Sequence, residues 1–90
     1  MVMVSKKTTV VNSQGFHMRP ASNFANAMSA FKSDVFINFG SAKINAKSVM
    51  NLIAGCIKAG SEIEIVCEGE DEQAALDKAV EMVENGFGEE

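Results

Sequence analysis

The stretch Asp34-Val35-Phe36-Ile37-Asn38-Phe39-Gly40-Ser41-Ala42-Lys43-Ile44-Asn45 decides the class of fold. Apolar residues at 35, 37 and 39 alternate with the residues between them, which predicts a strand with one buried face. The Gly40-Ser41 pair then separates this strand from a second one over Ala42–Asn45. The sequence therefore predicts a β-hairpin at the centre of the chain.

Two further strands are predicted on either side of this hairpin. Threonine and valine at positions 8–11 favour a first strand over Met3–Val11, and Asn12–Gly15 has the composition of a loop. Alternation predicts another strand over Ser61–Cys67, with Ile63, Ile65 and Cys67 on its apolar face and glutamates opposite.

Three helices are predicted from apolar residues at helical spacing, over Met18–Ala30, Lys47–Ala54 and Asp71–Asn85. The residues expected to face inward are Ala21, Phe24, Met28, Phe31, Leu76, Ala79, Val80 and Val83. Acidic residues suit the start of the last helix, and Gly86 suits the position after its end. The order βαββαβα predicts an α+β fold, a two-layer sandwich of sheet and helices.

Length and composition predict one globular domain over residues 1–90, because 47% of the residues are apolar and 22% are charged. A chain of this size is too small to enclose a deep active-site cavity. Residues 1–60 hold seven of the eight basic residues and a single acid, whereas residues 61–90 hold eleven acids. This asymmetry is consistent either with an acidic partner for the first part or with a solvated acidic helix beside an ordinary surface.

Several function classes are disfavoured by what the sequence lacks. It has neither a secretory signal nor an apolar run of roughly 18 residues, so we expect a cytoplasmic protein without membrane insertion. Cys56 and Cys67 make neither a disulfide framework nor a metal site, and we expect both to be small buried apolar residues. No cofactor motif, P-loop or nucleic-acid-binding motif is present. We therefore expect no metal, no cofactor and no autonomous catalyst.

One candidate site stands out, because the only histidine, arginine and proline of the chain fall within His17-Met18-Arg19-Pro20. These residues lie where a strand gives way to a helix, and a helix N-terminus attracts anions through its unpaired N–H groups. Neutral imidazole is a competent nucleophile near neutral pH, and a guanidinium stabilises phosphate oxygens. The alternative is that His17 is a helix cap or an ordinary surface residue.

The sequence Gly15-Phe16-His17-Met18-Arg19-Pro20-Ala21-Ser22 resembles the active-site signature of HPr, the histidine-containing phosphocarrier of the bacterial sugar phosphotransferase system. The resemblance extends through 31–34, 45–50 and 68–72 and covers essentially the whole chain. It implies an open-faced β-sandwich in which a four-stranded antiparallel sheet carries three helices on one face.

The same resemblance implies a function in sugar transport. Enzyme I, charged by phosphoenolpyruvate, would phosphorylate His17 on Nδ1, and the phosphohistidine would pass its phosphoryl group to sugar-specific IIA domains. Arg19 corresponds to the arginine that contacts the phosphate. Met18, Val49, Met50 and Ile53 correspond to the patch that docks these partners, with core packing as the alternative for the last three. We expect Leu52 and Ile57 to lie in the core, and we expect a monomer.

Ser48 corresponds to the regulatory serine of the family, which makes this chain a candidate phosphoprotein at a second position. HPr kinase/phosphorylase would modify it, and a transcriptional corepressor complex would bind the product. The alternative is a plain N-cap serine. A second functional hypothesis follows, in which the chain is a regulatory module of the same fold, although the purely regulatory members of the family lack the histidine.

Two positions depart from the family pattern. Met18 stands where a small residue is usual, next to the phosphorylated histidine, which puts access and partner preference in question. Asn51 and Gly55-Cys56 differ from common patterns on the regulatory helix. The resemblance implies that the specificity for particular sugars lies in the partner proteins.

Overall fold

The computed structural model describes residues 3–11, 15–55 and 57–88. The predicted order of elements is confirmed along these residues, with one short 3-10 helix added at the end. The elements are β1 (Met3–Thr9), α1 (Met18–Ser29), β2 (Asp34–Phe39), β3 (Ala42–Asn45), α2 (Val49–Ala54), β4 (Glu62–Glu68), α3 (Glu72–Glu84) and η1 (Gly86–Gly88). The loop residues 12–14 and Cys56, for which a loop and a buried thiol were predicted, lie outside the described residues.

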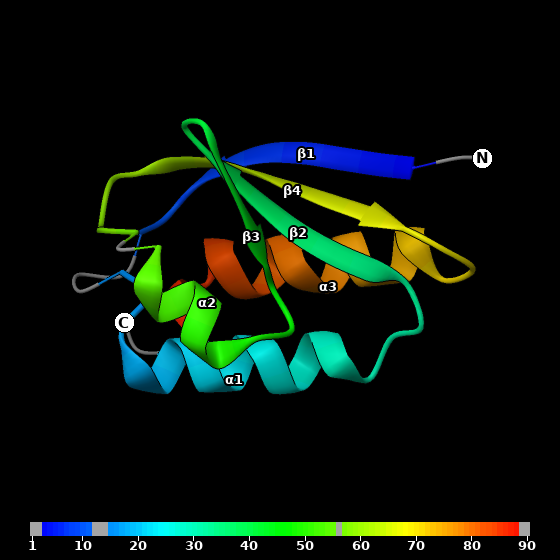
Figure 1. Ribbon diagram of the computed structural model, residues 1–90, viewed down its shortest axis with the longest axis horizontal. Coiled ribbons are helices and arrows are strands. Elements are labelled where there is room, and N and C mark those ends of the chain that lie inside the picture. The colour runs from blue at the N-terminus through cyan, green and yellow to red at the C-terminus, as the bar shows by residue number, and fades with distance from the viewer. Residues whose placement is uncertain (1–2, 12–14, 56, 89–90) are drawn as a thin grey trace.

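The four strands form one sheet in the order β1-β4-β2-β3, and every neighbouring pair is antiparallel. Val66 lies at the centre, paired with Ser5 on one side and Phe36 on the other. Figure 1 shows the sheet as one layer with all three helices on the same face. The predicted open-faced β-sandwich is therefore the fold of this chain.

The central hairpin has the predicted register, because Phe39 pairs with Ala42 across Gly40-Ser41. Gly40 takes a φ of +61°, a conformation that costs glycine little and other residues more. Phe39 is half-buried, whereas the alternation predicted full burial. It lies next to the turn and pairs with the edge strand β3, where little chain remains to cover it.

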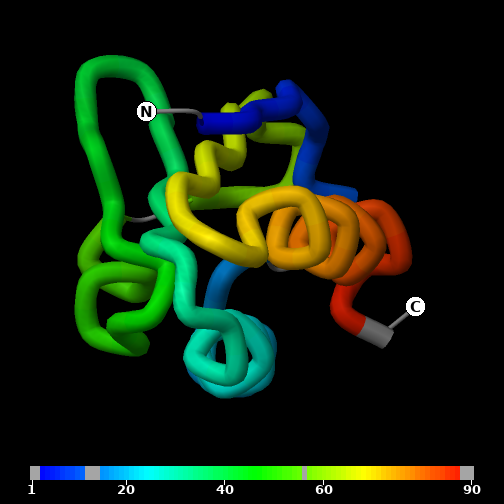
Figure 2. Tube along the Cα trace, turned by 90° about the vertical axis from the view of Figure 1, so that its right-hand side faces the viewer, coloured from blue at the N-terminus to red at the C-terminus, as the bar shows by residue number. Residues whose placement is uncertain are grey.

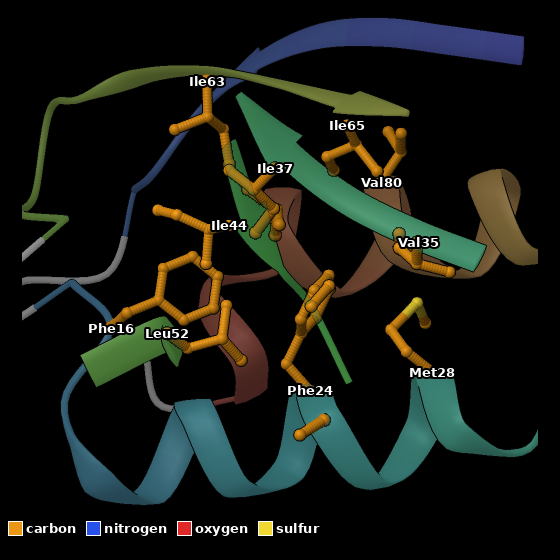
Figure 3. Packing of buried hydrophobic residues seen from close by; sticks show 14 of the residues in the cluster. Phe16, Phe24, Met28, Val35, Ile37, Ile44, Leu52, Ile63, Ile65 and Val80 are labelled. Atoms are coloured by element: carbon orange, nitrogen blue, oxygen red, sulfur yellow. The ribbon is translucent and has the colours of Figure 1, made fainter. Parts of the chain in front are cut away.

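The core lies between the sheet and the helices (Figure 3). Phe24 and Met28 rise from α1 toward Ile37 and Ile65 of the sheet, and all four side chains are fully buried. Burying a side chain of this size stabilises the fold by about 1.5–3 kcal/mol. The other predicted core residues that are buried are Ala21, Val35, Leu52, Ile57, Ile63, Cys67, Leu76, Ala79, Val80 and Val83.

The helices α1 and α3 cover most of the sheet. Figure 2 views both helices nearly along their axes, which shows that the axes of α1 and α3 point in nearly the same direction in space. The two helices also contact each other. Their apolar stripes therefore meet below the sheet, while the short α2 closes one end of the same layer (Figure 1).

Several element boundaries differ by one or two residues from the sequence prediction; β4 and α3 are each displaced by a single residue at either end. β1 ends at Thr9, because Val10 leaves the sheet ladder and exchanges hydrogen bonds with the 60–61 turn instead. α1 ends at Ser29, so Phe31 lies beyond the helix and is only half-buried. α2 begins at Val49, because Ser48 has an extended backbone and acts as the N-cap.

Candidate functional site

His17 is the N-cap of α1, with an extended backbone and a half-buried side chain. Its carbonyl accepts the first helical hydrogen bond from the Ala21 N–H at 3.0 Å, and its own N–H donates to the Gly15 carbonyl at 3.1 Å. The imidazole makes no capping bond to the helix. The structure therefore places the histidine at the start of α1, where the sequence predicted it, with its backbone fixed on both sides.

The first turn of α1 offers donors to an anion beside His17. The N–H groups of Met18 and Arg19 have no partner inside the helix, and Pro20 fills the third position without an N–H. The first turn contains no acidic residue. Arg19 is exposed at the same turn. These donors, together with the positive end of the helix dipole, favour a phosphoryl group at this position.

The segment before His17 is held by the chain that leads into β4. The Phe16 N–H donates to the Ile57 carbonyl at 3.0 Å. Gly15 has a φ of +66°, and a Cβ there would lie 2.4 Å from the Ile57 oxygen and 2.8 Å from the Lys58 Cα. Only glycine lets the two segments approach this closely. The backbone that carries His17 is thus fixed against residues 57–58, which are 40 positions away in the chain.

Apolar side chains are exposed or half-buried on the first turn of α1 and on α2. Met18 and Met50 are 64% and 73% exposed, and they are two of the four exposed large apolar residues among those described. Val49 and Ile53 are half-buried and pack partly against the core. α1 and α2 contact each other, so these side chains belong to neighbouring elements. We refer to Met18, Val49, Met50 and Ile53 as the methionine surface.

Ser48 caps α2, because its Oγ accepts a hydrogen bond from the Asn51 N–H at 3.3 Å. The cap thus satisfies the backbone N–H of Asn51, a position that departs from the family pattern. The adjacent Lys47 donates from Nζ to the Phe31 carbonyl at 2.8 Å, beyond the end of α1. The serine is half-buried and performs the structural role that was its alternative interpretation.

Other candidate chemistries find little support in the described residues. Cys67 is fully buried, and burial raises the pKa of its thiol to about 11, with Glu72 and Asp71 adding to the shift. It is therefore an unreactive thiol at neutral pH. Across residues 3–11, 15–55 and 57–88, no three His, Cys, Asp or Glu side chains are grouped to hold a metal ion. In the same ranges, no helix has the length and apolar character required to span a membrane.

One groove of the molecule lies away from the candidate site. A groove of about 700 Å³ runs between β1 and α3 and includes none of the predicted site residues. His17 lies at the start of α1 with a half-buried side chain.

Comparison with known proteins agrees with the fold and the site. Residues 4–85 match the family model described as the PTS HPr component phosphorylation site. The phosphocarrier protein HPr of Treponema pallidum is 41% identical over 88 residues, which cover 98% of this chain and 100% of that protein. The HPr-like protein Crh of Bacillus subtilis is 39% identical, covering 91% of this chain and 96% of its own length. HPr of Thermoanaerobacter tengcongensis superimposes with a TM-score of 0.90 at 33% identity, covering 100% and 99% of the two chains. This chain belongs to the HPr phosphocarrier family.

Sequence reasoning missed two features of the site. The close approach of Gly15 to Lys58 leaves no local pattern in the sequence, because it joins two loops. The one available signal was the glycine two residues before His17, since glycine readily takes a positive φ. Lys58 adds an exposed cation to the segment that holds residues 15–16. Phe87, at the far end of the chain, packs on Phe16 with ring centroids 4.8 Å apart.

Proposed function

We propose that this chain is a cytoplasmic phosphocarrier that takes a phosphoryl group from phosphorylated enzyme I onto His17 and passes it to sugar-specific IIA domains. The lone pair of Nδ1 forms the N–P bond as the bond between phosphorus and the donor breaks, and that electron pair stays with the donor. The reverse exchange delivers the group to the next protein. The chain is a substrate in both steps and turns over nothing by itself.

The observation that carries this proposal is the position of His17 as the N-cap of α1. The histidine is next to two backbone N–H groups that have no partner within the helix. The first turn of the helix, which follows His17, contains Arg19 and no acidic residue. A phosphoryl group on the imidazole carries roughly two negative charges, which these groups stabilise by hydrogen bonding and by the helix dipole. Arg19 adds the charge-assisted contact that an isolated helix end lacks.

Partner binding is assigned to the methionine surface. Met18 and Met50 expose apolar area that the fold itself does not use. Exposed apolar side chains beside a reacting group are a common feature of transient protein interfaces, in which a few central residues contribute most of the binding energy. The neighbouring cations Arg19 and Lys58 favour partners whose surface is acidic.

The test is a mass spectrum of the purified chain after incubation with enzyme I and phosphoenolpyruvate. We expect a single added phosphate that is lost in mild acid, since a phosphohistidine is acid-labile and a phosphoserine is not. The His17→Ala variant should accept none. An IIA domain added afterwards should gain the phosphate as this chain loses it.

Two controls make the result decisive. An HPr of known activity must accept phosphate in the same mixture, which shows that enzyme I and phosphoenolpyruvate are competent. Urea unfolding of His17→Ala must show that the variant is folded under the assay conditions, so that a loss of phosphate acceptance reports on the imidazole. Acid-stable phosphate, or phosphate that persists in His17→Ala, would disprove the assignment.

A second candidate function is a regulatory module that acts through phosphorylation of Ser48 by HPr kinase/phosphorylase and binding to a transcriptional corepressor complex. The relative from Bacillus subtilis, Crh, is described as the catabolite repression HPr, and its likeness to this chain favours this alternative. The presence of His17 argues against an exclusively regulatory role. ATP-dependent, acid-stable phosphorylation that is absent in Ser48→Ala would establish it.

The oligomeric state belongs to the same proposal. One crystal structure of HPr from Thermoanaerobacter tengcongensis is that of a dimer. We propose that the working form of this chain is a monomer, because each transfer requires the methionine surface to be open to a partner. Light scattering across the concentrations used for the transfer assay measures this directly.

A further inference from the structure

The described part of the chain ends in an unusual turn. After α3, Gly86 has a φ of +62°, and Phe87 has φ +57° and ψ +23°. Phe87 is the one described residue other than glycine with a positive φ. The left-handed conformation costs a non-glycine residue about 1–2 kcal/mol. Packing elsewhere must therefore hold Phe87 in place.

The packing that holds it is a cluster of three rings, which we call the aromatic cluster (Phe16, Phe24, Phe87). The ring of Phe87 lies 4.8 Å from that of Phe16 and 5.9 Å from that of Phe24. Phe16 and Phe24 complete the cluster at 5.5 Å with an edge-on geometry. All three are buried, and Phe87 is 8% exposed. Such ring pairs contribute about 0.5–1.5 kcal/mol each beyond the area they bury.

The aromatic cluster ends directly at the candidate site, because Phe16 precedes His17 in the chain. Figure 3 shows the Phe16 ring at one end of the core, at the same end as Leu52. The 3-10 helix η1, which contains Phe87, contacts both α1 and α3. Phe87 thus reaches the residue before His17 from the opposite end of the sequence.

Two contacts then fix Phe16. Its N–H is bonded to the Ile57 carbonyl, and its ring is packed between Phe24 of α1 and Phe87 of η1. Without the Phe87 ring, the Phe16 side chain would lose one wall of its packing, and the Ile57 hydrogen bond alone would hold Phe16 in place. The segment that carries His17 would then be held less tightly, and a displacement of about 1 Å can cost a transfer reaction a hundredfold in rate.

We propose that Phe87 is a positioning residue for His17, which acts through Phe16 to hold the imidazole at the start of α1. The proposal rests on the phosphoryl-acceptor function proposed above and assigns to the C-terminal turn a role in that reaction. Phe87 makes no contact with the transferred group in this scheme. Its effect is on the rate of transfer and not on partner binding.

The experiment compares Phe87→Ala with Phe87→Leu and with a matched core variant, Val80→Ala. Val80 lies on α3, is 8% exposed like Phe87, and is not a member of the aromatic cluster. Enzyme I is assayed with each variant as acceptor, at a temperature where urea curves show less than about 1% unfolded chain. We expect Phe87→Ala to lower kcat at least about tenfold with KM within twofold, and Phe87→Leu to lose about threefold.

A second readout follows His17 itself. The imidazole resonances of His17 should shift in Phe87→Ala and stay in place in Val80→Ala, whatever the relative stability of the two variants. If Phe87→Ala does not fold, the kcat and the His17 resonances of Phe87→Leu are compared with those of Val80→Ala instead.

The result that overturns the proposal is a kcat in Phe87→Ala equal to that of the parent chain. An equal loss of kcat in Val80→Ala would overturn it too, because the effect would then be general destabilisation. If the parent chain itself accepts no phosphate, the proposed function fails. The His17 resonances of Phe87→Ala then decide the positioning role, and unchanged resonances refute it.

Discussion

Ser33 and Asp71 are joined by two hydrogen bonds across 38 positions of the chain. Ser33 Oγ donates to Asp71 Oδ1 at 2.5 Å, and the Ser33 N–H donates to the same oxygen at 2.9 Å. The Lys32 N–H donates to Asp71 Oδ2, also at 2.9 Å. Asp71 is the N-cap of α3, and its carbonyl accepts the Ala75 N–H at 2.9 Å, but its side chain makes no capping bond to the helix. Its carboxylate instead satisfies the turn between α1 and β2, which ties the helical layer to the sheet.

The pH dependence of stability follows from this arrangement. The hydroxyl of Ser33 and then the Lys32 N–H lower the pKa of Asp71 from 3.8 to about 2. A lowered pKa in the folded state means that the contribution of Asp71 is fully present above pH 3.8 and is lost as the pH falls through about 2. Asp71→Asn should therefore unfold at lower urea than the parent chain at pH 7, and the difference should shrink on acidification. Asp77→Asn, on the exposed side of α3, is the control, and an Asp71→Asn difference that stays constant down to pH 2 would contradict the assignment.

Gly15 and Gly40 allow the cost of a left-handed backbone conformation to be measured separately from the cost of a steric collision. Both have φ near +60°, but a Cβ at Gly40 meets nothing within 4 Å, whereas one at Gly15 collides with the Ile57–Lys58 backbone. Gly40→Ala should cost about 1–2 kcal/mol of unfolding free energy, the cost of the left-handed conformation. Gly15→Ala should cost about 3 kcal/mol or more, because part of the backbone must move as well. Urea unfolding measures both, and equal losses would show that the two segments are not in contact.

The cap of α2 gives a prediction for Ser48. Its Oγ accepts the Asn51 N–H, and the loss of such a cap costs about 1 kcal/mol. Ser48→Ala should be destabilised by this amount, whereas Ser48→Asp should keep the cap and the stability, because aspartate caps helices as well as serine does. Ser41→Ala, on the exposed hairpin turn, is the control. Parent-like stability of Ser48→Ala would show that the cap contributes nothing.

Met18 and Met3 test the methionine surface. They are 64% and 62% exposed, so truncation of either should change stability by less than about 0.5 kcal/mol. Met18→Ala should raise the KM of enzyme I for this chain about tenfold, because an interface anchor contributes about 1–2 kcal/mol. Met3→Ala, on β1, should leave KM unchanged. A parent-like KM in Met18→Ala would exclude Met18 from the docking surface.

Periodic residues made the elements predictable. Alternation in 34–39 and 62–68 and helical spacing in α1 and α3 follow directly from which side chains must be buried, and each element was found within two residues of its predicted bounds. The two side chains whose burial was predicted wrongly lie where the local sequence pattern constrains burial least. Phe31 and Phe39 lie at the end of an element or next to a turn, and there the burial of a side chain depends on what the rest of the chain brings over it.

The site divides in the same way. His17 and Arg19 could be chosen from sequence, because the only histidine and the only arginine stand two residues apart at a helix start. Lys58 and Phe87 could not, because neither belongs to a motif. They approach Gly15 and Phe16 only through contacts between segments far apart in the chain.

The sequence by itself determined the order of elements, the hairpin and the choice of His17 as the candidate reacting side chain, because these depend on the spacing of residues within about fifteen positions. Only the tertiary structure decided what surrounds His17. The Ile57 carbonyl that anchors Phe16 and the Phe87 ring that packs on it both come from more than thirty positions away. The same holds, beyond the other end of α1, for the Asp71 carboxylate that ties Ser33 in place. Such contacts form only after the sheet and helices have packed, since no local energy selects the partner before the core brings the segments together.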